Sequence, residues 1–364
     1  MRRTFHAFVA AGFLLLAPRA LAADDLDEML EAARARHDIP AIAALVLKDG
    51  EIVAEGAVGE RAMGSGVRVT RDDLWHLGSN TKAMTAFLAA RLIDKGLLDW
   101  RTTLHDVLGE SVPDMRDVYE PVTLDDLFSH QSGLPANLPA LPILMFKADD
   151  RPLSLQRLAY AQAALIDAPR GERGRYFEYS NSGFVVAAAM LETAADSDYE
   201  TLMQREIFAP LGITHFGWGP PGTDGTLDQP IAHAGAIPVT ARVASDNPAV
   251  LSGAGTLHLS LRDWAKFADA MLDAMGGDTS LVSADALLHL TTPQHDGSTY
   301  AGGWVLVTAL GDGVIAHEGS NTVWYAIIAL SPHTNTAILL VSNSGAARDA
   351  EVEVLQQILA TYPL

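Results

Sequence analysis

Hydrophobic positions along this chain follow two periods, and the period changes with position. Near the N-terminus, apolar residues between positions 24 and 37 recur at helical spacing and predict an amphipathic helix. Ala41–Leu47 and Ile52–Val58 then have strand character, and the Asp49-Gly50 pair between them is a strong hairpin signal. From residue 79 to about residue 295, helical periodicity dominates.

The strand period returns near the C-terminus. Four short runs predict strands before a closing helix over residues 346–360, and these runs are Gly303–Thr308, Gly313–His317, Val323–Leu330 and Thr336–Val341. Strands grouped at both ends and joined by tight turns favour one antiparallel sheet. The sequence therefore predicts an α+β fold, with an antiparallel sheet built from both termini, flanking helices and a large, mainly helical insert.

This pattern also suggests domain boundaries, because 364 residues exceed one average domain. We expect a sheet domain with terminal helices from residues 24–78 plus 297–364, and a helical domain with active-site loops from residues 79–296. Two segments of the helical part stand out. Leu134–Pro142 is apolar and proline-rich, which favours an ordered loop that lines a pocket. Phe216–Gly255 is rich in Gly and Pro without periodicity, which is typical of a functional or flexible loop.

The first 22 residues have a different character. Arg2 and Arg3 precede an apolar run over residues 7–17, and Ala20-Leu21-Ala22 offers a cleavage site between small residues. The pattern predicts a signal peptide over residues 1–22 and an exported protein, periplasmic or secreted; a first helix packed in the core is the alternative. The run is shorter than the roughly 20 apolar residues of a membrane span, so we expect no stable insertion after cleavage.

Charge and cysteine content narrow the chemistry. The formal net charge of −20 argues against nucleic acid or an anionic membrane surface as a partner. The chain has no cysteine, which excludes disulfides, thiol catalysis and zinc–thiolate sites. The sequence has no His-Glu-x-x-His run, no Gly-x-Ser-x-Gly elbow and no phosphate-binding glycine loop. We expect no cofactor and no metal, and a small-molecule or peptide substrate; the oligomeric state stays open.

Ser79-Asn80-Thr81-Lys82 is the strongest candidate for chemistry. An apolar segment ending in Gly78 precedes it, and strong helix formers follow it. Residues three apart share a helix face, so the Lys82 amine should lie beside the Ser79 hydroxyl. Serine attacks only when a base takes its proton, and lysine can do so if burial lowers its pKa from about 10.4. A serine N-cap followed by a chance lysine is the alternative.

Tyr179-Ser180-Asn181 is the second candidate, in a polar loop before a helix. The pKa of a phenol is about 10, and a neighbouring ammonium would lower it, so Tyr179 could act as a general base on Ser79. Asn181 could donate to a substrate carbonyl and accept from Lys82. A polar N-cap with a packed tyrosine beneath it is the alternative.

His317-Glu318-Gly319-Ser320 is the third candidate, at the end of the strand that starts at Gly313. A strand edge beside a nucleophile can offer a backbone N–H to an oxyanion, and Gly319 would allow close approach. The His317 ring could hydrogen-bond the substrate. His233-Ala234-Gly235 repeats the pattern without a strand around it and ranks lower. A structural role is the alternative for either histidine.

Together the three motifs resemble those of a known superfamily. Ser79-x-x-Lys82, Tyr179-x-Asn181 and His317-x-Gly319 occur in order and with wide gaps, as in the class C-like branch of the serine beta-lactamases and penicillin-binding proteins. That branch includes D,D-peptidases, D-aminopeptidases and carboxylesterases of the family VIII type. Residues 127–134 and 301–304 are similar to two further motifs of the family, Ser-His-x-Ser-Gly-Leu and Gly-x-Gly-Trp. The resemblance covers nearly the whole chain after residue 22.

The resemblance implies a role for each motif. Ser79 would attack the acyl carbon and form an acyl-enzyme, and the N–H groups of Ser79 and Ser320 would form the oxyanion hole. Tyr179 and Lys82 would share the proton transfers, and which of them is the base stays open. The substrate-binding set would be Asn181, His317, Gly319 and Ser320.

One departure from the family pattern bears on the substrate. In beta-lactamases and penicillin-binding proteins the third motif begins with a lysine that helps hold the substrate carboxylate. Here His317 is mostly neutral at pH 7, and Glu318 is expected to add negative charge. This favours a serine hydrolase of carboxylesterase or D-amino-acid peptidase type. The alternatives are a true beta-lactamase or D,D-carboxypeptidase, or, in another class, a non-catalytic penicillin-binding-like sensor or binding protein.

Overall fold

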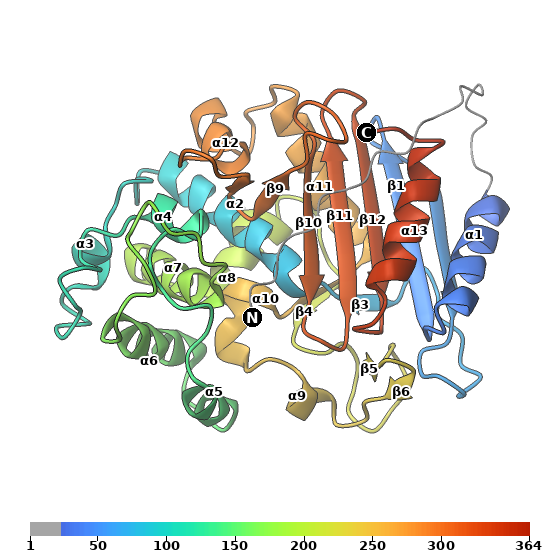
Figure 1. Ribbon diagram of the computed structural model, residues 1–364, viewed down its shortest axis with the longest axis horizontal. Coiled ribbons are helices and arrows are strands. Elements are labelled where there is room, and N and C mark those ends of the chain that lie inside the picture. The colour runs from blue at the N-terminus through green and yellow to red at the C-terminus, as the bar shows by residue number, and fades with distance from the viewer. Residues whose placement is uncertain (1–22) are drawn as a thin grey trace.

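The computed structural model describes residues 23–364 and has an α+β fold (Figure 1). The predicted signal peptide lies outside the described residues. The main sheet consists of β1 (Ala41–Lys48), β2 (Glu51–Gly59), β8 (Tyr300–Ala301), β9 (Trp304–Leu306), β10 (Ile315–Ser320), β11 (Tyr325–Ser331) and β12 (Thr336–Ser342). Two smaller sheets are formed by β3 (Leu74–His76), β7 (Leu257–Ser260) and β4 (Phe216–Trp218), and by β5 (His233–Ala234) and β6 (Ile237–Pro238).

Helices are the main regular structure in the rest of the described chain. The α-helices are α1 (Ala23–Arg36), α2 (Thr81–Asp94), α3 (Leu104–Leu108), α4 (Leu124–Phe128), α5 (Ala140–Lys147), α6 (Leu153–Leu165), α7 (Asn181–Ala195), α8 (Tyr199–Met203), α9 (Arg242–Ser245), α10 (Ser252–Gly255), α11 (Leu261–Met275), α12 (Ala284–Thr291) and α13 (Arg348–Leu359). Shorter or irregular turns are η1 (Gly78–Asn80), η2 (Gln204–Phe208) and η3 (Ala249–Leu251).

The main sheet joins the two ends of the chain. Its strand order is β2-β1-β12-β11-β10-β9-β8, and its adjacent strands are antiparallel. β1 pairs with β12 inside the sheet, where Leu45 lies opposite Leu339. The predicted antiparallel sheet built from both termini is therefore confirmed, and β8 adds a short edge strand that the sequence did not indicate.

The two faces of the sheet pack against different helices. Alternate residues of a strand point to opposite faces, so Leu45 and Leu339 join one buried cluster while Val46 and Ile338 join another. The second cluster contains residues of α1 and α13, which cover the outer face of the sheet in Figure 1. The first cluster reaches into the helical part of the molecule. Sheet and helical insert thus share a continuous core.

α2 lies in the middle of that shared core. It is rich in Ala, Leu and Met, which are strong helix formers, and most of its residues are buried. Figure 1 shows α2 between the main sheet and the helices α4 and α7. Its N-terminal end, next to η1, lies against β10. The fold therefore brings the start of α2 to the boundary between sheet and helices.

Three expectations about local structure need correction. Phe216–Gly255 contains three short strands and the helical turns α9, η3 and α10, so it is more ordered than its composition suggests. Leu134–Pro142 ends inside a helix, because α5 begins at Ala140. His317 lies within β10 and does not end it, since the strand continues to Ser320.

Candidate active site

The Ser79 turn is pressed against strand β10. Gly78 has a positive φ of 52°, and a Cβ at this position would lie 2.5 Å from the Ser320 backbone nitrogen. A Cβ at Gly319 would lie 2.0 Å from the Leu77 carbonyl oxygen. Only glycine fits at either position, because a side chain would overlap the facing backbone. This contact places Ser79 beside the end of β10.

Hydrogen bonds hold the same turn in place. The Asn80 side chain donates to the carbonyl oxygens of Leu77 and Ala326, at 3.1 and 3.2 Å, and so ties η1 to β11. The Thr81 hydroxyl donates to the Gly78 carbonyl at 2.8 Å. Since Ser79 lies between these two bonded residues, its position is fixed by its neighbours, while its own side chain stays half-buried.

The Lys82 amine lies beside the Ser79 hydroxyl, as the spacing of the motif predicts. Its Nζ atom is 3.1 Å from Ser79 Oγ, 2.7 Å from Asn181 Oδ1 and 2.7 Å from the Ala254 carbonyl oxygen. The residue is fully buried, and burial lowers the pKa of Lys82 well below its usual value. A neutral amine has two N–H groups and one lone pair. In the neutral state the two N–H groups can be donated to the oxygens of Asn181 and Ala254, which leaves the lone pair available to the Ser79 hydroxyl.

Tyr179 completes the immediate surroundings of Ser79. The Lys82 Nζ atom lies 4.9 Å from the centre of the Tyr179 ring, and the phenol is hydrogen-bonded to Ser79. Burial raises the pKa of Tyr179 above its usual value, and the bond to Ser79 only partly opposes this. The expectation that a neighbouring ammonium makes the phenol easier to ionise was therefore wrong. Burial favours the uncharged forms of both the Lys82 amine and the Tyr179 phenol.

Asn181 lies at the first position of α7 and connects the site to the Leu134–Pro142 segment. Its side-chain nitrogen donates to Asn137 Oδ1 at 2.9 Å, and its backbone nitrogen donates to the Ala136 carbonyl at 2.8 Å. Ser180 caps the helix by accepting a hydrogen bond from the Gly183 nitrogen. Asn181 Oδ1 is thereby left to accept from Lys82.

His317 enters the site from the inner face of β10. Its ring stacks on that of Tyr179, with centres 6.3 Å apart, and its Nε2 atom lies 3.3 Å from the Tyr300 hydroxyl. Burial, together with the positive charge that Lys82 can carry, lowers the pKa of His317 to about 3. The histidine is therefore neutral at pH 7.

Glu318 does not add negative charge to the site, and this expectation was wrong. Its side chain accepts hydrogen bonds from the Arg348 guanidinium at 3.1 and 3.2 Å and from the Tyr325 hydroxyl. Alternate residues of a strand face opposite sides. Glu318 therefore points toward α13, while His317 points toward Tyr179 and Tyr300.

Gly319 and Ser320 end β10 next to the Ser79 turn. The Ser320 backbone nitrogen adjoins Gly78, while the Ser320 hydroxyl donates to the Trp324 carbonyl at 2.8 Å. The Ser320 side chain is therefore engaged in the turn after β10. The backbone N–H groups of Ser79 and Ser320 are the candidate oxyanion hole.

The sequence motifs missed three contributors to the site. The Ala254 carbonyl and Asn137 come from the two loops singled out for composition alone, and no motif marks a backbone oxygen. Tyr300 precedes the Gly-x-Gly-Trp motif, and only its position next to that motif could have indicated it. His233 lies elsewhere and has a structural role, because both of its ring nitrogens bond to backbone atoms of Met63 and Asn343.

A cavity of about 850 Å³ adjoins this site through Tyr300. Its walls are Gln131, Gly174, Arg175, Phe177, Gln294, His295, Asp296, Gly297, Ser298, Thr299, Tyr300 and Val305. None of the residues predicted for catalysis lines it.

Within residues 23–364, no group of three or more His, Cys, Asp or Glu side chains could hold a metal ion. Over the same range, no helix combines the length and apolar character that crossing a bilayer requires.

Comparison with known proteins identifies the family. A family model described as Beta-lactamase matches residues 26–361, and the chain therefore belongs to the beta-lactamase family. Penicillin-binding protein 4 of Amycolatopsis lactamdurans is 26% identical, over 91% of this chain and 88% of its own length. The chain spans 53% to 62% of the length of further curated relatives that it matches.

Solved structures show the same fold. EstCE1, described as a hydrolase with promiscuous acyltransferase activity, has a TM-score of 0.74 and 17% identity, over 93% of this chain and 98% of its own. The D-amino acid amidase of Ochrobactrum anthropi SV3, complexed with D-phenylalanine, has a TM-score of 0.71 and 19% identity, over 92% and 98%. These likenesses confirm the beta-lactamase/transpeptidase-like fold, and the family model confirms the resemblance seen in the sequence.

Proposed function

We propose that this protein is a serine hydrolase that cleaves esters or amides through an acyl-enzyme at Ser79, in the manner of a carboxylesterase or a D-amino-acid peptidase. One observation carries the proposal. The Lys82 amine is fully buried, and its Nζ atom lies 3.1 Å from Ser79 Oγ. A neutral amine in that position can take the proton that a serine must lose when it attacks.

The same contacts support an order of proton transfers. Lys82 accepts the Ser79 proton while Oγ bonds to the acyl carbon, and the negative charge that develops on the acyl oxygen faces the N–H groups of Ser79 and Ser320. The phenol of Tyr179 keeps its proton and so can donate it to the leaving group as the bond to the acyl carbon breaks. Lys82 returns a proton to Tyr179, and water then hydrolyses the acyl-enzyme.

Acylation by a short ester tests this proposal. We expect p-nitrophenyl acetate to give a burst of p-nitrophenol equal to the enzyme concentration, because one acyl group is transferred to each Ser79. Ser79→Ala should remove the burst and abolish labelling by a fluorophosphonate probe. A folded wild-type protein that neither bursts nor reacts with the probe would support the non-catalytic sensor instead.

A true beta-lactamase or D,D-carboxypeptidase is the second candidate, favoured by the penicillin-binding relative. The neutral His317 argues against it, because the ring offers no charge to a substrate carboxylate. Nitrocefin, a D-Ala-D-Ala peptide and the ester should be compared under the same conditions. We expect turnover of the ester to exceed that of nitrocefin, and fast nitrocefin turnover would favour the second candidate.

We also propose that the protein is exported to the periplasm or secreted, on the basis of the pattern in residues 1–22. Expression of the full chain in a Gram-negative host provides the test. The mature N-terminus, read by mass spectrometry of the extracytoplasmic fraction, should begin near Ala23. An intact N-terminus in the cytoplasmic fraction would contradict this part of the proposal.

A further inference from the structure

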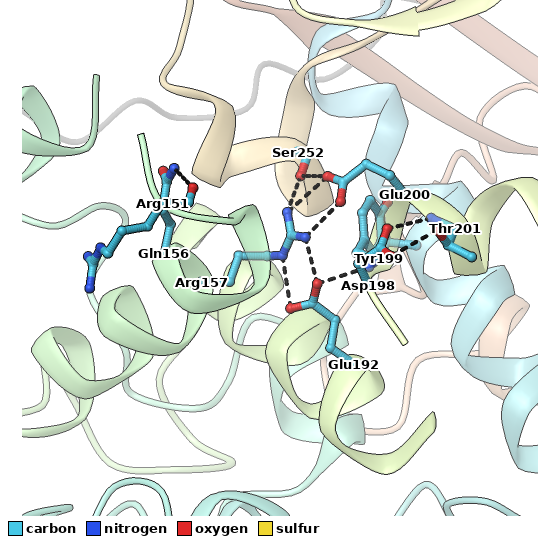
Figure 2. Close-up of polar contacts among 10 residues, drawn as sticks. Arg151, Gln156, Arg157, Glu192, Asp198, Tyr199, Glu200, Thr201 and Ser252 are labelled. Atoms are coloured by element: carbon cyan, nitrogen blue, oxygen red, sulfur yellow. Dashed lines mark hydrogen bonds and ion pairs between the residues drawn. The ribbon is translucent and has the colours of Figure 1, made fainter. Parts of the chain in front are cut away.

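A buried arginine joins three helices behind the Ser79 site. Arg157, on α6, is fully buried. It donates to both carboxylate oxygens of Glu192 on α7, at 3.0 and 2.6 Å. It also donates to both carboxylate oxygens of Glu200 on α8, at 3.0 and 2.8 Å. Figure 2 shows the guanidinium between the two carboxylates.

The remaining contact of Arg157 leads toward Lys82. Its Nη1 atom donates to Ser252 Oγ at 2.6 Å, and the Ser252 hydroxyl donates to Glu200 at 2.8 Å (Figure 2). A guanidinium has five N–H groups, and these contacts use all five. Ser252 is the first residue of α10, which also contains Ala254. The carbonyl of Ala254 is the one that accepts from Lys82.

A second branch of the network reaches the same short helix. Glu192 accepts from the Tyr199 backbone nitrogen at 2.9 Å, and the Tyr199 hydroxyl lies 2.7 Å from Thr85 Oγ1. Thr85 in turn donates to the Gly253 carbonyl at 2.7 Å. Because Thr85 lies three residues after Lys82 on α2, both residues bind α10 from the same helix face. The two branches thus hold Ser252 and Gly253, directly before Ala254.

We propose that Arg157 is a positioning residue of the Ser79 site, which holds α10 so that the Ala254 carbonyl keeps the Lys82 amine directed at Ser79. The inference rests on the proposed function, because it assigns Arg157 a part in acylation. Arg157 touches neither Ser79 nor Lys82, and its direct contact with α10 is the hydrogen bond to Ser252. Lysine cannot replace it, because one ammonium has three donors and no planar fork.

Ser252→Ala is the first test, because it removes the contact to α10 and leaves both ion pairs of Arg157 intact. We expect the rate constant of the p-nitrophenyl acetate burst to fall about tenfold, while the ester concentration for half-maximal burst rate stays unchanged. The rise of the burst rate with pH should move to higher pH, because a loosened α10 admits water to the amine and Lys82 then holds its proton more tightly. Arg157→Lys should lower the burst rate further.

Two matched variants separate positioning from general loss of structure. Arg91→Lys alters an arginine that pairs with the buried Glu206 at the other end of α2, and Ser342→Ala removes a buried hydroxyl bonded to the Ala41 carbonyl. Both controls should keep the wild-type burst and pH dependence. In folded Ser252→Ala, either a burst rate within threefold of wild type or an unmoved pH dependence would overturn the proposal. A wild-type protein without any burst would instead overturn the proposed function.

Discussion

In the described part of the chain, Lys82 and Arg157 are both fully buried cationic side chains, and their surroundings are opposite. The hydrogen-bond partners of Lys82 among the described residues are the uncharged Ser79, Asn181 and Ala254 carbonyl. Arg157 has two carboxylates, Glu192 and Glu200. Burial lowers the pKa of Lys82. Burial acts in the same direction on Arg157, but its hydrogen bonds with the two carboxylates outweigh it and raise the pKa of that guanidinium.

Under the proposed function, this difference separates a reactive group from a structural one. A buried cation without a counter-charge gives up its proton and can act as a base. A buried cation with two counter-charges keeps its charge and holds the elements that carry its partners together. The short helix α10 bonds to both sites, through the Ala254 carbonyl and the Ser252 hydroxyl. The following predictions exchange or remove the charges of such buried groups, starting with the largest expected effect.

Lys82→Arg should place a permanent positive charge at position 82, like that of Arg157. A guanidinium does not release its proton at any accessible pH, so Ser79 would lose its base. We expect the burst rate with p-nitrophenyl acetate to fall about a thousandfold. Lys95→Arg, at the C-terminal end of α2, is the matched control and should keep the wild-type rate. A burst within tenfold of wild type in Lys82→Arg would contradict a base role for Lys82.

Arg157→Met should destabilise the protein, because it leaves the carboxylates of Glu192 and Glu200 without their positively charged partner. Removing one partner of a buried ion pair typically lowers the free energy of unfolding by about 3–5 kcal/mol. Urea titration followed by circular dichroism measures this change. Adding Glu192→Gln and Glu200→Gln should restore part of the lost stability, because no buried charge then remains. If the free energy of unfolding of the single variant fell by less than about 1 kcal/mol, the cluster would not be an important source of stability.

Lys82→Met should change the free energy of unfolding in the opposite direction and stabilise the protein. The folded state disfavours the proton that the unfolded lysine carries below about pH 10.4, so the wild-type protein loses stability as the pH falls from that value toward the folded pKa. We expect Lys82→Met to raise the free energy of unfolding by about 1 kcal/mol at pH 7. The gain should be smaller at pH 10, and urea titrations at both pH values measure it. A loss of stability at pH 7 would indicate that the bonds of Lys82 outweigh its burial.

Glu351→Gln should have the smallest effect. Glu351 is fully buried on α13, and neither of its carboxylate oxygens has a hydrogen-bond partner among the described residues. Burial raises its pKa, and the negative charge of Glu318 adds to this. The folded state therefore favours the proton, and stability is lost as the pH rises above the unfolded value of about 4.3.

The glutamine variant should remove that loss. We expect Glu351→Gln to match the wild-type stability near pH 4.5 and to exceed it by about 0.5–1 kcal/mol at pH 8. Thermal unfolding at the two pH values measures the difference, with the exposed Glu120→Gln as the control. An equal difference at both pH values would contradict a protonated Glu351.

Sequence patterns predicted the parts of this molecule that depend on local periodicity. Helical spacing placed Lys82 beside Ser79, and the strand patterns at the two ends of the chain indicated that the first and last strands belong to one antiparallel sheet. The position of Asn181 at a helix start also followed from local signals, because Ser180 is a typical N-cap. In each case the feature depends on residues that are close together in the sequence or on the regular spacing of hydrophobic residues in strands.

The parts that escaped prediction depend on long-range packing. Ala254 contributes a backbone oxygen from a segment without periodicity, and nothing in its side chain marks that role. The proton affinity of Tyr179 depends on burial, which the residues around it in sequence do not reveal. The Arg157 cluster joins residues 35 to 95 positions apart, so its carboxylates and serine could not be assigned to one another.

The contact between Gly78 and Gly319 limits how this protein could be redesigned. Neither position has space for even a methyl group, so backbone alone sets the gap between the attacking hydroxyl and the strand that faces it. Larger acyl groups would therefore have to be accommodated by side chains near the site and not by this contact. Engineering for new substrates should leave the two glycines untouched and vary residues such as Asn137, which bonds to Asn181.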